Sequence, residues 1–331
     1  MTLTSRNVLV TGAGGFIGSH LAEALVERGC KVKAFVLYDS LNSSGWLDHS
    51  SRRREMEIVA GDLTDRDCVR AAMQGCDIVF HLGALIAIPY SYRAPASYVQ
   101  VNVGGTLNVL QAARDLDVSR VIHTSTSEVY GTARYVPINE DHPLQAQSPY
   151  AASKIAADKL AESFFHSFGL PVVTIRPFNT FGPRQSPRAV IPTVVLQCLN
   201  GGKVELGNLE PTRDFTFVDD TVNGFLQAAQ SEEAIGETLN LGTGHEVSIE
   251  DLVTLIGRVT NVTPRVVRSA ARARPANSEV DRLCADASKA ERYLGWRPTV
   301  SLEEGISRFV TWMSANMHLH LKRYSPAEYA I

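Results

Sequence analysis

The chain begins its first apolar run with Asn7-Val8-Leu9-Val10 and continues directly into Thr11-Gly12-Ala13-Gly14-Gly15-Phe16-Ile17-Gly18. A continuous apolar run is typical of a strand buried on both faces of a parallel sheet. Residues 16–28 then carry apolar side chains at helical spacing, up to Gly29, a suitable C-cap. The spacing G-x-x-G-x-x-G permits a tight turn, close approach to a pyrophosphate and close helix–strand packing. We therefore expect a dinucleotide to contact Gly12, Gly15, Phe16, Ile17 and Gly18.

Strand-like and helix-like segments alternate through the first 176 residues. Strands are expected at residues 7–10, 32–37, 56–59, 77–81, 120–124 and 171–176, and long helices at 97–116 and 149–168. This rhythm predicts an α/β fold with a doubly wound parallel (Rossmann) sheet. We therefore assign residues 1–176 to a dinucleotide-binding domain.

The sequence pattern changes after Arg176, where prolines and glycines interrupt the chain and leave only short segments with a helix or strand signal. Residues 240–241 and 266–267 look like isolated short strands, and residues 249–259 and 301–313 look like helices. We expect residues 177–331 to form mainly a smaller C-terminal α/β lobe that binds the substrate, with some segments returning to the main sheet. His318 and His320 are expected to be solvated, and no metal site is predicted.

The composition is that of an ordinary soluble globular protein, with 44% hydrophobic and 20% charged residues. A formal net charge of −3 gives no electrostatic case for binding nucleic acid or a membrane. The five cysteines lack zinc-type spacing and are expected to be reduced thiols. Neither a membrane-spanning run nor a signal peptide is recognised, so a cytoplasmic protein is expected.

The residues that follow the second, third and fourth strands should line the cofactor, because the carboxyl ends of parallel strands meet at one edge. The nearest acid after the second strand is Asp39, which could reach the adenosine 2′-hydroxyl or be a solvated turn residue. Arg52, Arg53 and Arg54 could instead receive a 2′-phosphate, so NAD is favoured over NADP but both remain open. The further cofactor contacts that we expect are Asp62, Leu63, Leu82, Gly83 and Ala84.

Two motifs carry the chemistry: Ser125-Thr126-Ser127-Glu128-Val129-Tyr130-Gly131 and Tyr150-Ala151-Ala152-Ser153-Lys154. Tyr150 and Lys154 are spaced i, i+4, so on a helix they share one face. A lysine ammonium beside a tyrosine favours the phenolate and makes the phenol a usable base near neutral pH. Such a base suits removal of an alcohol proton while a hydride leaves the same carbon. The motifs predict an oxidoreductase-type enzyme.

As a set, these motifs resemble the extended short-chain dehydrogenases/reductases that act on nucleotide sugars. The resemblance covers nearly the whole chain. Within the family, the chain most resembles the legionaminic-pathway NDP-N-acetylglucosamine 4,6-dehydratases, and the supporting segments include residues 87–92, 186–192 and 274–280. It implies that Asn102, Pro177, Tyr150 and Lys154 also contact the cofactor. The matching segments are the glycine turn, Gly61-Asp62-Leu63, His81-Leu82-Gly83-Ala84, Asn102, Thr126 with Tyr150-x-x-x-Lys154, and Arg176-Pro177-Phe178-Asn179.

The resemblance also implies a catalytic cycle on a sugar. Tyr150 as phenolate, with Lys154 nearby and Thr126 hydrogen-bonded to the same oxygen, takes the C4 hydroxyl proton while the C4 hydride passes to NAD. Glu128 then removes the C5 proton, water leaves from C6 and the hydride returns to C6. NAD ends unchanged and acts as a tightly held catalyst. The implied substrate is UDP- or GDP-N-acetylglucosamine, and the product is its 4-keto-6-deoxy derivative.

One residue departs from the family pattern. Nucleotide-glucose 4,6-dehydratases usually carry Thr-Asp-Glu, in which the Asp protonates the departing C6 oxygen, whereas this chain has Thr126-Ser127-Glu128. Because a serine hydroxyl is a poor proton donor, Glu128 would have to carry the C5 proton to the C6 oxygen itself. Thr-Ser-Glu also resembles UDP-glucuronate decarboxylases, so decarboxylation is the main alternative, followed by 4-epimerisation and 5,6-dehydration. Rivals outside this chemistry are an NAD(P)-binding sensor, which typically lacks the phenol–amine pair, and an ordinary alcohol dehydrogenase.

The resemblance places substrate contacts in the C-terminal half. Asn179, Arg213 and Arg274 are expected to hold the diphosphate, since guanidinium groups can fork onto phosphate oxygens. Tyr92 and Arg188 are candidates near the sugar or the nucleotide, together with Thr126. The two long helices carry more apolar residues than one core face needs, and the family implies that they pair across a two-fold axis, so a homodimer is expected.

Overall fold

A computed structural model describes residues 2–269 and 275–323 of the chain. Its main sheet has seven strands, and every pairing between neighbours is parallel. The order across the sheet is β10 (Thr238–Leu241), β6 (Val172–Pro177), β5 (Arg120–Thr124), β4 (Ile78–His81), β1 (Asn7–Thr11), β2 (Lys31–Leu37) and β3 (Met56–Gly61). The order reverses between β1 and β4, and ligands of doubly wound sheets bind outside the carboxyl ends of the strands at such a point.

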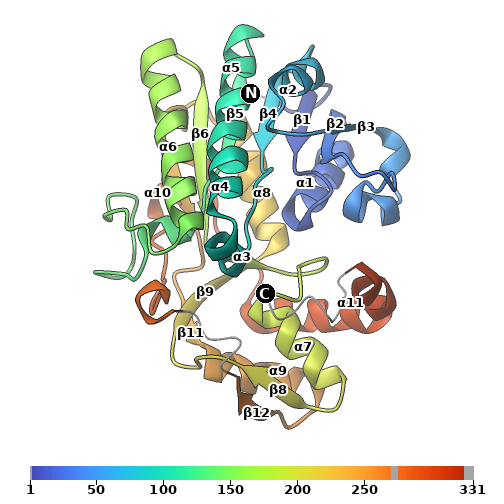
Figure 1. The fold of residues 1–331 in the computed structure, drawn as a ribbon, viewed down its shortest axis with the longest axis vertical. Coiled ribbons are helices and arrows are strands. Elements are labelled where there is room, and N and C mark those ends of the chain that lie inside the picture. The colour runs from blue at the N-terminus through green and yellow to red at the C-terminus, as the bar shows by residue number, and fades with distance from the viewer. Residues whose placement is uncertain (1, 270–274, 324–331) are drawn as a thin grey trace.

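Helices cover both faces of this sheet (Figure 1). One face carries α2 (Arg66–Met73), α5 (Gly105–Asp115) and α6 (Pro149–Phe168). The opposite face carries α1 (Phe16–Glu27), α8 (Val218–Gln230) and α10 (Ser288–Leu294). The Rossmann-type fold predicted from the alternating pattern is therefore confirmed.

The predicted catalytic pair, Tyr150 and Lys154, lies on α6 because the sequence starts that helix at a defined residue. The Ser148 hydroxyl accepts a hydrogen bond from the Ala151 N–H, and Pro149 occupies the first turn, where its missing N–H costs nothing. Gly169, at φ 67°, ends the helix in the left-handed conformation. These two ends fix Tyr150 and Lys154 in the first two turns, next to the carboxyl end of the sheet.

The remaining elements build a second lobe beside the carboxyl ends of the main strands, in the lower half of Figure 1. Its sheets are β11 (Glu246–Ser248), β9 (Thr212–Phe217) and β7 (Asn179–Phe181), and the pair β12 (Arg265–Arg268) and β8 (Lys203–Leu206). Its helices are α7 (Val190–Leu199), α9 (Ile249–Thr260) and α11 (Leu302–Arg323). Three short helical segments, α3 (Ile88–Arg93), α4 (Pro95–Tyr98) and the π-helix η3 (Val99–Gly104), lead from the loop after β4 into α5.

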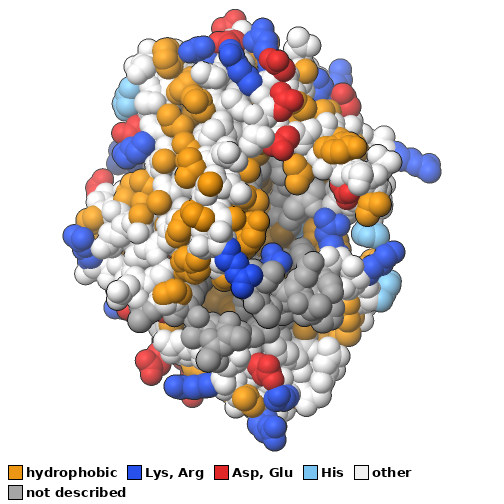
Figure 2. Space-filling model, viewed as in Figure 1, with side chains coloured by type: hydrophobic (Ala, Val, Ile, Leu, Met, Phe, Trp, Pro, Cys, Tyr) orange, Lys and Arg blue, Asp and Glu red, His pale blue; other side chains and the backbone are white. Residues whose placement is uncertain are grey.

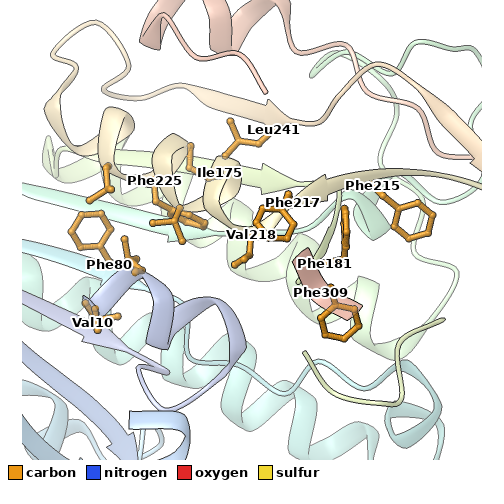
Figure 3. Packing of buried hydrophobic residues seen from close by; sticks show 14 of the residues in the cluster. Val10, Phe80, Ile175, Phe181, Phe215, Phe217, Val218, Phe225, Leu241 and Phe309 are labelled. Carbon is orange, nitrogen blue, oxygen red and sulfur yellow. The ribbon is translucent and has the colours of Figure 1, made fainter. Parts of the chain in front are cut away.

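The two halves share one hydrophobic core. Buried side chains of the main sheet, such as Val10, Phe80 and Ile175, belong to the same cluster as Phe181 and Phe309 of the second lobe (Figure 3). A second cluster fills the space between the sheet and the α2, α5 and α6 helices. The continuous core holds the lobe in a fixed place relative to the sheet edge where the cofactor motifs lie.

Several predicted elements need correction. Residues 240–241 are not an isolated strand, because β10 pairs in parallel with β6 and completes the main sheet. The helix predicted at 97–116 is interrupted by the π-helical turns of η3. Helices α7 and α8 were missed, since the dense prolines and glycines around them hid two ordinary apolar stretches. His320 is fully buried and its Nε2 lies 2.8 Å from the Gln185 carbonyl oxygen, so the expectation that it is solvated was wrong, whereas His318 is exposed.

Candidate active site

The glycine turn between β1 and α1 has no room for side chains. Gly12 adopts φ +70°, and a Cβ there would lie 2.8 Å from the Gly83 nitrogen. A Cβ on Gly18 would overlap the Gly12 carbonyl oxygen, and one on Gly15 would lie 3.2 Å from it. Phe16 and Ile17 open α1 and pack against the core. The bare backbone and the helix N-terminus form a cradle that suits a pyrophosphate, and a side chain would fill it.

A buried polar chain fixes the loop after β4 next to this turn. The Thr11 hydroxyl accepts from the Leu82 N–H at 3.1 Å and from the Gly83 N–H at 3.0 Å, and lies 2.8 Å from His81 Nδ1. With both acceptor positions used, Thr11 donates to Nδ1, so Nε2 carries the proton that reaches Thr106 Oγ1 at 3.0 Å. Burial and the nearby His123 hold the pKa of His81 well below its ordinary value. The imidazole is therefore neutral and serves as a structural brace.

The residues predicted for the adenosine half lie around the same edge. Leu63 is buried, and its side chain packs where a Cβ on Gly83 would be, while Ala84 directly follows Gly83. Asp62 is exposed, and its Oδ1 accepts from the N–H and the hydroxyl of Thr64. Asp39 lies two residues beyond β2, and its Oδ1 accepts from the Leu41 N–H at 2.9 Å. Contact of these side chains with a cofactor stays a prediction.

The predicted catalytic residues come together at the carboxyl end of β5 and the start of α6. The Tyr150 ring is 7% exposed, and its hydroxyl is hydrogen-bonded to the Thr126 side chain, which also accepts from the Glu128 N–H at 3.2 Å. The part-exposed Glu128 carboxylate lies close enough to raise the pKa of Tyr150 by its charge. Ser127 is buried, with 3% of its surface exposed.

The electrostatics of the phenol differ from the expectation. We expected Lys154 to lower the pKa of Tyr150, but in the protein alone this pKa is raised, first by burial and then by the charges of Glu128 and Asp158. The Lys154 ammonium donates to the Thr124 carbonyl at 2.6 Å, and burial lowers its own pKa to about 8. Loss of hydration outweighs the hydrogen bond with Thr126, which lowers the pKa of the phenol. Ionisation of the phenol therefore needs further positive charge in the site.

Asn102 braces the site from η3. Its Oδ1 accepts from the Leu85 N–H, and its amide nitrogen donates to the Leu85 carbonyl and to the Ser153 hydroxyl. Ser153 in turn donates to the Tyr150 carbonyl at 2.7 Å. These contacts fasten the loop after β4 to the catalytic helix, while the predicted contact of Asn102 with the cofactor stays a prediction. Pro177 is buried at the end of β6.

The substrate-side candidates approach from the second lobe. Asn179 begins β7, and its buried Oδ1 has no hydrogen-bond partner among the described residues. Arg213 on the adjacent β9 is buried, and its guanidinium lies 3.5 Å from Glu279 Oε1. Burial raises the pKa of Tyr98 to about 12, and the exposed Arg188 lies near enough for its charge to oppose part of this rise. The Tyr98 ring meets the Tyr150 ring edge-on at 6.2 Å between centroids, which links Arg188 to the catalytic region.

Two further candidates are placed differently. The Tyr92 hydroxyl is hydrogen-bonded to the Ser278 hydroxyl at 2.5 Å, so it joins the loop after β4 to the segment before α10. Arg274 lies outside the described residues.

Among the described residues, no cluster of His, Cys, Asp and Glu side chains could hold a metal ion. Within the same part of the chain, no helix has the length and apolarity to cross a bilayer.

The sequence interpretation missed a buried network next to Tyr150 and Lys154. Asp158 is 4% exposed and contacts Ser125, His123 and Arg176. Arg176 also donates to the Tyr130 hydroxyl, which donates to Asn240 Oδ1 at 2.8 Å. The helical spacing of Asp158, four residues after Lys154, was the signal that could have found it.

Comparisons with known proteins identify the family of this chain. A family model described as GDP-mannose 4,6 dehydratase matches residues 9–309. The UDP-glucose 4-epimerase of Mycolicibacterium smegmatis is 35% identical over 311 residues, which cover 91% of this chain and 96% of that one. The dTDP-glucose 4,6-dehydratase of Streptomyces antibioticus is 34% identical over 315 residues, covering 94% and 93%.

The solved structures support the same family. A dTDP-glucose 4,6-dehydratase from Streptomyces venezuelae, with NAD and TYD bound, superposes with a TM-score of 0.86 at 31% identity and covers 96% of this chain and 99% of that chain. Each of these matches covers nearly the whole of this chain. The chain belongs to the nucleotide-sugar dehydratases and epimerases of the extended short-chain dehydrogenase/reductase family.

Proposed function

We propose that the protein is an NAD-dependent nucleotide-sugar 4,6-dehydratase, which converts UDP- or GDP-N-acetylglucosamine into the 4-keto-6-deoxy sugar. Family membership leaves 4,6-dehydration and 4-epimerisation open, because the relatives include both kinds of enzyme. The choice between them rests on Glu128.

The observation that carries the proposal is a carboxylate beside the catalytic phenol. Glu128 raises the pKa of Tyr150, so it opposes formation of the phenolate that must take the C4 hydroxyl proton. An epimerase needs only that phenol and the nicotinamide, so Glu128 would have no function in it to offset this effect. A dehydratase also needs a base for C5, and a part-exposed carboxylate at this place can serve. The unfavourable effect of Glu128 on the ionisation of Tyr150 is thus offset by its proposed role as the base at C5.

NAD is the cofactor that the surroundings favour. Arg52 forms ion pairs with Glu27 and Glu55, and Arg53 donates to the Ser44 hydroxyl and lies near Asp48, so these arginines already have partners. The dehydratase from Streptomyces venezuelae was solved with NAD. The turn from Gly12 to Gly18 would hold the pyrophosphate, with Asp39 as the proposed contact to the ribose. When bound, oxidised NAD supplies a hydride acceptor for C4 and a positively charged ring.

The proposed proton transfers use this chain's own side chains. Tyr150 takes the proton of the C4 hydroxyl, and Thr126 steadies the phenolate through its hydroxyl. Oxidation at C4 makes the C5 hydrogen acidic, and Glu128 removes it. The same carboxylic acid then protonates the departing C6 oxygen, because Ser127 is a buried and weakly acidic hydroxyl. When the hydride returns to C6, C5 takes up a proton from the solvent, which completes the 4-keto-6-deoxy sugar.

Decarboxylation of UDP-glucuronate is less well supported. Its substrate carries a carboxylate on C5, which would lie near Glu128, whose charge already acts on the Tyr150 phenol. Two negative charges side by side would repel each other. A neutral hydroxymethyl group at this position meets no such repulsion.

The proposal is tested by weighing the products. The protein is incubated separately with UDP-N-acetylglucosamine, GDP-N-acetylglucosamine and UDP-glucuronate, in deuterated water. We expect one of the first two to lose water and to gain one deuterium at C5. Loss of carbon dioxide would instead identify a decarboxylase, and an isomer of unchanged mass without deuterium would identify an epimerase. Either result would refute the proposal.

We also propose a homodimer that forms through α5 and α6. Figure 2 shows hydrophobic side chains gathered in a band over these helices. Val99 and Phe168, at the ends of this face, are 57% and 53% exposed. Exposed apolar bands of this kind often mark contacts between subunits. Light scattering at micromolar concentration should give twice the chain mass, and a monomer would remove the proposal.

A further inference from the structure

One face of α6 carries a row of three buried polar side chains. Tyr150, Lys154 and Asp158 follow each other at intervals of four residues, and are 7%, 4% and 4% exposed. Residues at this spacing lie one above the other along a helix. The proposed chemistry uses the first two and leaves Asp158 without a role.

Asp158 is held by donors from two neighbouring strands. The Ser125 hydroxyl donates to Oδ2 at 2.7 Å, and Arg176 donates to the same oxygen from Nε at 3.2 Å and from Nη2 at 3.0 Å. His123 Nε2 lies 3.1 Å from Oδ1. Burial alone would raise the pKa of this carboxyl, but the His123 hydrogen bond and the Arg176 charge outweigh it and leave the pKa at about 2. Asp158 is therefore a permanent anion with a fixed position.

Lys154 is connected to the same strand end. Its ammonium donates to the Thr124 carbonyl, and the next residue, Ser125, donates to Asp158. The charged and titratable groups around the ammonium are Asp158 and Tyr150 on α6, His81 on β4, His123 on β5 and Arg176 on β6. Burial lowers the pKa of both histidines, so they are neutral at neutral pH. Asp158 is the fully buried anion of this set.

We propose that Asp158 is a positioning residue that keeps the Lys154 side chain charged and aligned below Tyr150. A fully buried lysine without an anion tends to lose its proton, because the charged form is poorly solvated. A neutral Lys154 would leave an ionised phenol without its cation. Asp158 prevents this from one helical turn away.

The charges of the set support the assignment. At neutral pH the buried side chains carry two cations, Lys154 and Arg176, and one anion, Asp158. The part-exposed Glu128 lies outside this buried set and, like Asp158, raises the pKa of Tyr150 by its charge, so an ionised Tyr150 depends on the Lys154 cation. Arg176 contacts Asp158 and also donates from Nη1 to the Tyr130 hydroxyl at 2.9 Å. Asp158 in turn raises the pKa of Lys154.

The direct test is a titration of Lys154 in the full-length protein without substrate. Lysine is labelled with carbon-13 at Cε, and the Lys154 signal is identified by its loss in Lys154→Met. In the wild type we expect a midpoint at about pH 8. Asp158→Asn keeps the shape of the side chain and removes its charge, so the midpoint should fall by about one pH unit or more. An unchanged midpoint would overturn the proposal.

A matched control separates charge from packing. Ser125→Ala removes one hydrogen bond to Asp158 and keeps the carboxylate, so the Lys154 midpoint should move by much less than in Asp158→Asn. Equal shifts in both variants would refute the charge effect. If Asp158→Asn does not fold, the wild-type midpoint still decides: a value near 5 to 6, as burial alone produces, would show that Asp158 does not hold the charge.

Turnover gives a second readout, which rests on the proposed function. Because Lys154 must stay protonated, the alkaline limb of the kcat profile should move to lower pH in Asp158→Asn, with about tenfold lower kcat at pH 8 and a KM within about threefold. A uniform loss at all pH values would contradict a positioning role. If no nucleotide sugar is converted, the proposed function fails, but the titration still tests Asp158.

Discussion

Replacing Glu128 by glutamine should separate the two halves of the proposed reaction. The carboxylate opposes ionisation of Tyr150 and is the proposed base for the C5 proton. Glutamine keeps the size of the side chain but removes its charge and its basicity. Oxidation at C4 should therefore proceed at least as fast as in the wild type, while loss of water should nearly stop.

The expected magnitude follows from these two effects. A positioned general acid or base contributes about 10²- to 10⁴-fold to a rate, which is about 3 to 5 kcal/mol of barrier. Because Glu128 serves as base at C5 and as acid at C6 in this proposal, the loss should lie toward the upper end. The neighbouring hydroxyl of Ser127 is too weak an acid to replace it.

The assay follows both halves in one experiment. Enzyme in excess is mixed with the nucleotide sugar, the absorbance of reduced nicotinamide reports C4 oxidation, and mass spectrometry of quenched samples reports loss of water. Glu162→Gln makes the same chemical change at an exposed ion pair with Lys159 and should behave as the wild type. Glu128→Gln should build up reduced nicotinamide without product. Dehydration within tenfold of the wild type, or loss of C4 oxidation, would refute the reasoning.

Three further predictions test other parts of the molecule. Gly18→Ala places a methyl group against the Gly12 carbonyl and should weaken NAD binding more than tenfold by calorimetry, while Gly104→Ala, whose nearest neighbour is 4.0 Å away, should bind normally; equal affinities would contradict the cradle. His20 has its pKa lowered to about 4 by burial and by Arg184, so the unfolded chain binds more protons between about pH 6.5 and 4. Stability should fall as the pH drops through that window, and His20→Gln should reduce the fall by about 1 to 2 kcal/mol in urea unfolding, discounted for partial exposure; an unchanged slope would contradict the assignment. Arg213→Ala should raise KM for the nucleotide sugar by about 10- to 100-fold with little change in kcat, as expected for a lost charged hydrogen bond; a loss confined to kcat would show that Arg213 does not hold the diphosphate.

The sequence predicted the parts of this molecule that depend on local pattern. The Gly12–Gly18 turn could be located because a strand, a turn and a helix each leave a signal within a few residues. The spacing of Tyr150 and Lys154 likewise placed both on one helix face. The structure brings these elements together at the carboxyl edge of the sheet, where the topology requires them to be.

The parts that were missed depend on contacts between distant segments. The hydrogen bonds that connect Thr11, His81 and Thr106 join three elements, and no local sequence pattern reports these contacts. The same holds for the return of β10 to the main sheet, since its four residues look like any short apolar stretch. The raised pKa of Tyr150 was missed because it results mainly from burial, which spacing does not report.

The central claim is that a hydrogen leaves C4 and returns to C6 of the same sugar. A nucleotide N-acetylglucosamine with deuterium at C4 is the most direct test, with the product analysed by NMR. We expect the deuterium at C6 of a 4-keto sugar, and no product from Tyr150→Phe. Deuterium that stays at C4, or that is lost from the sugar, would contradict the account.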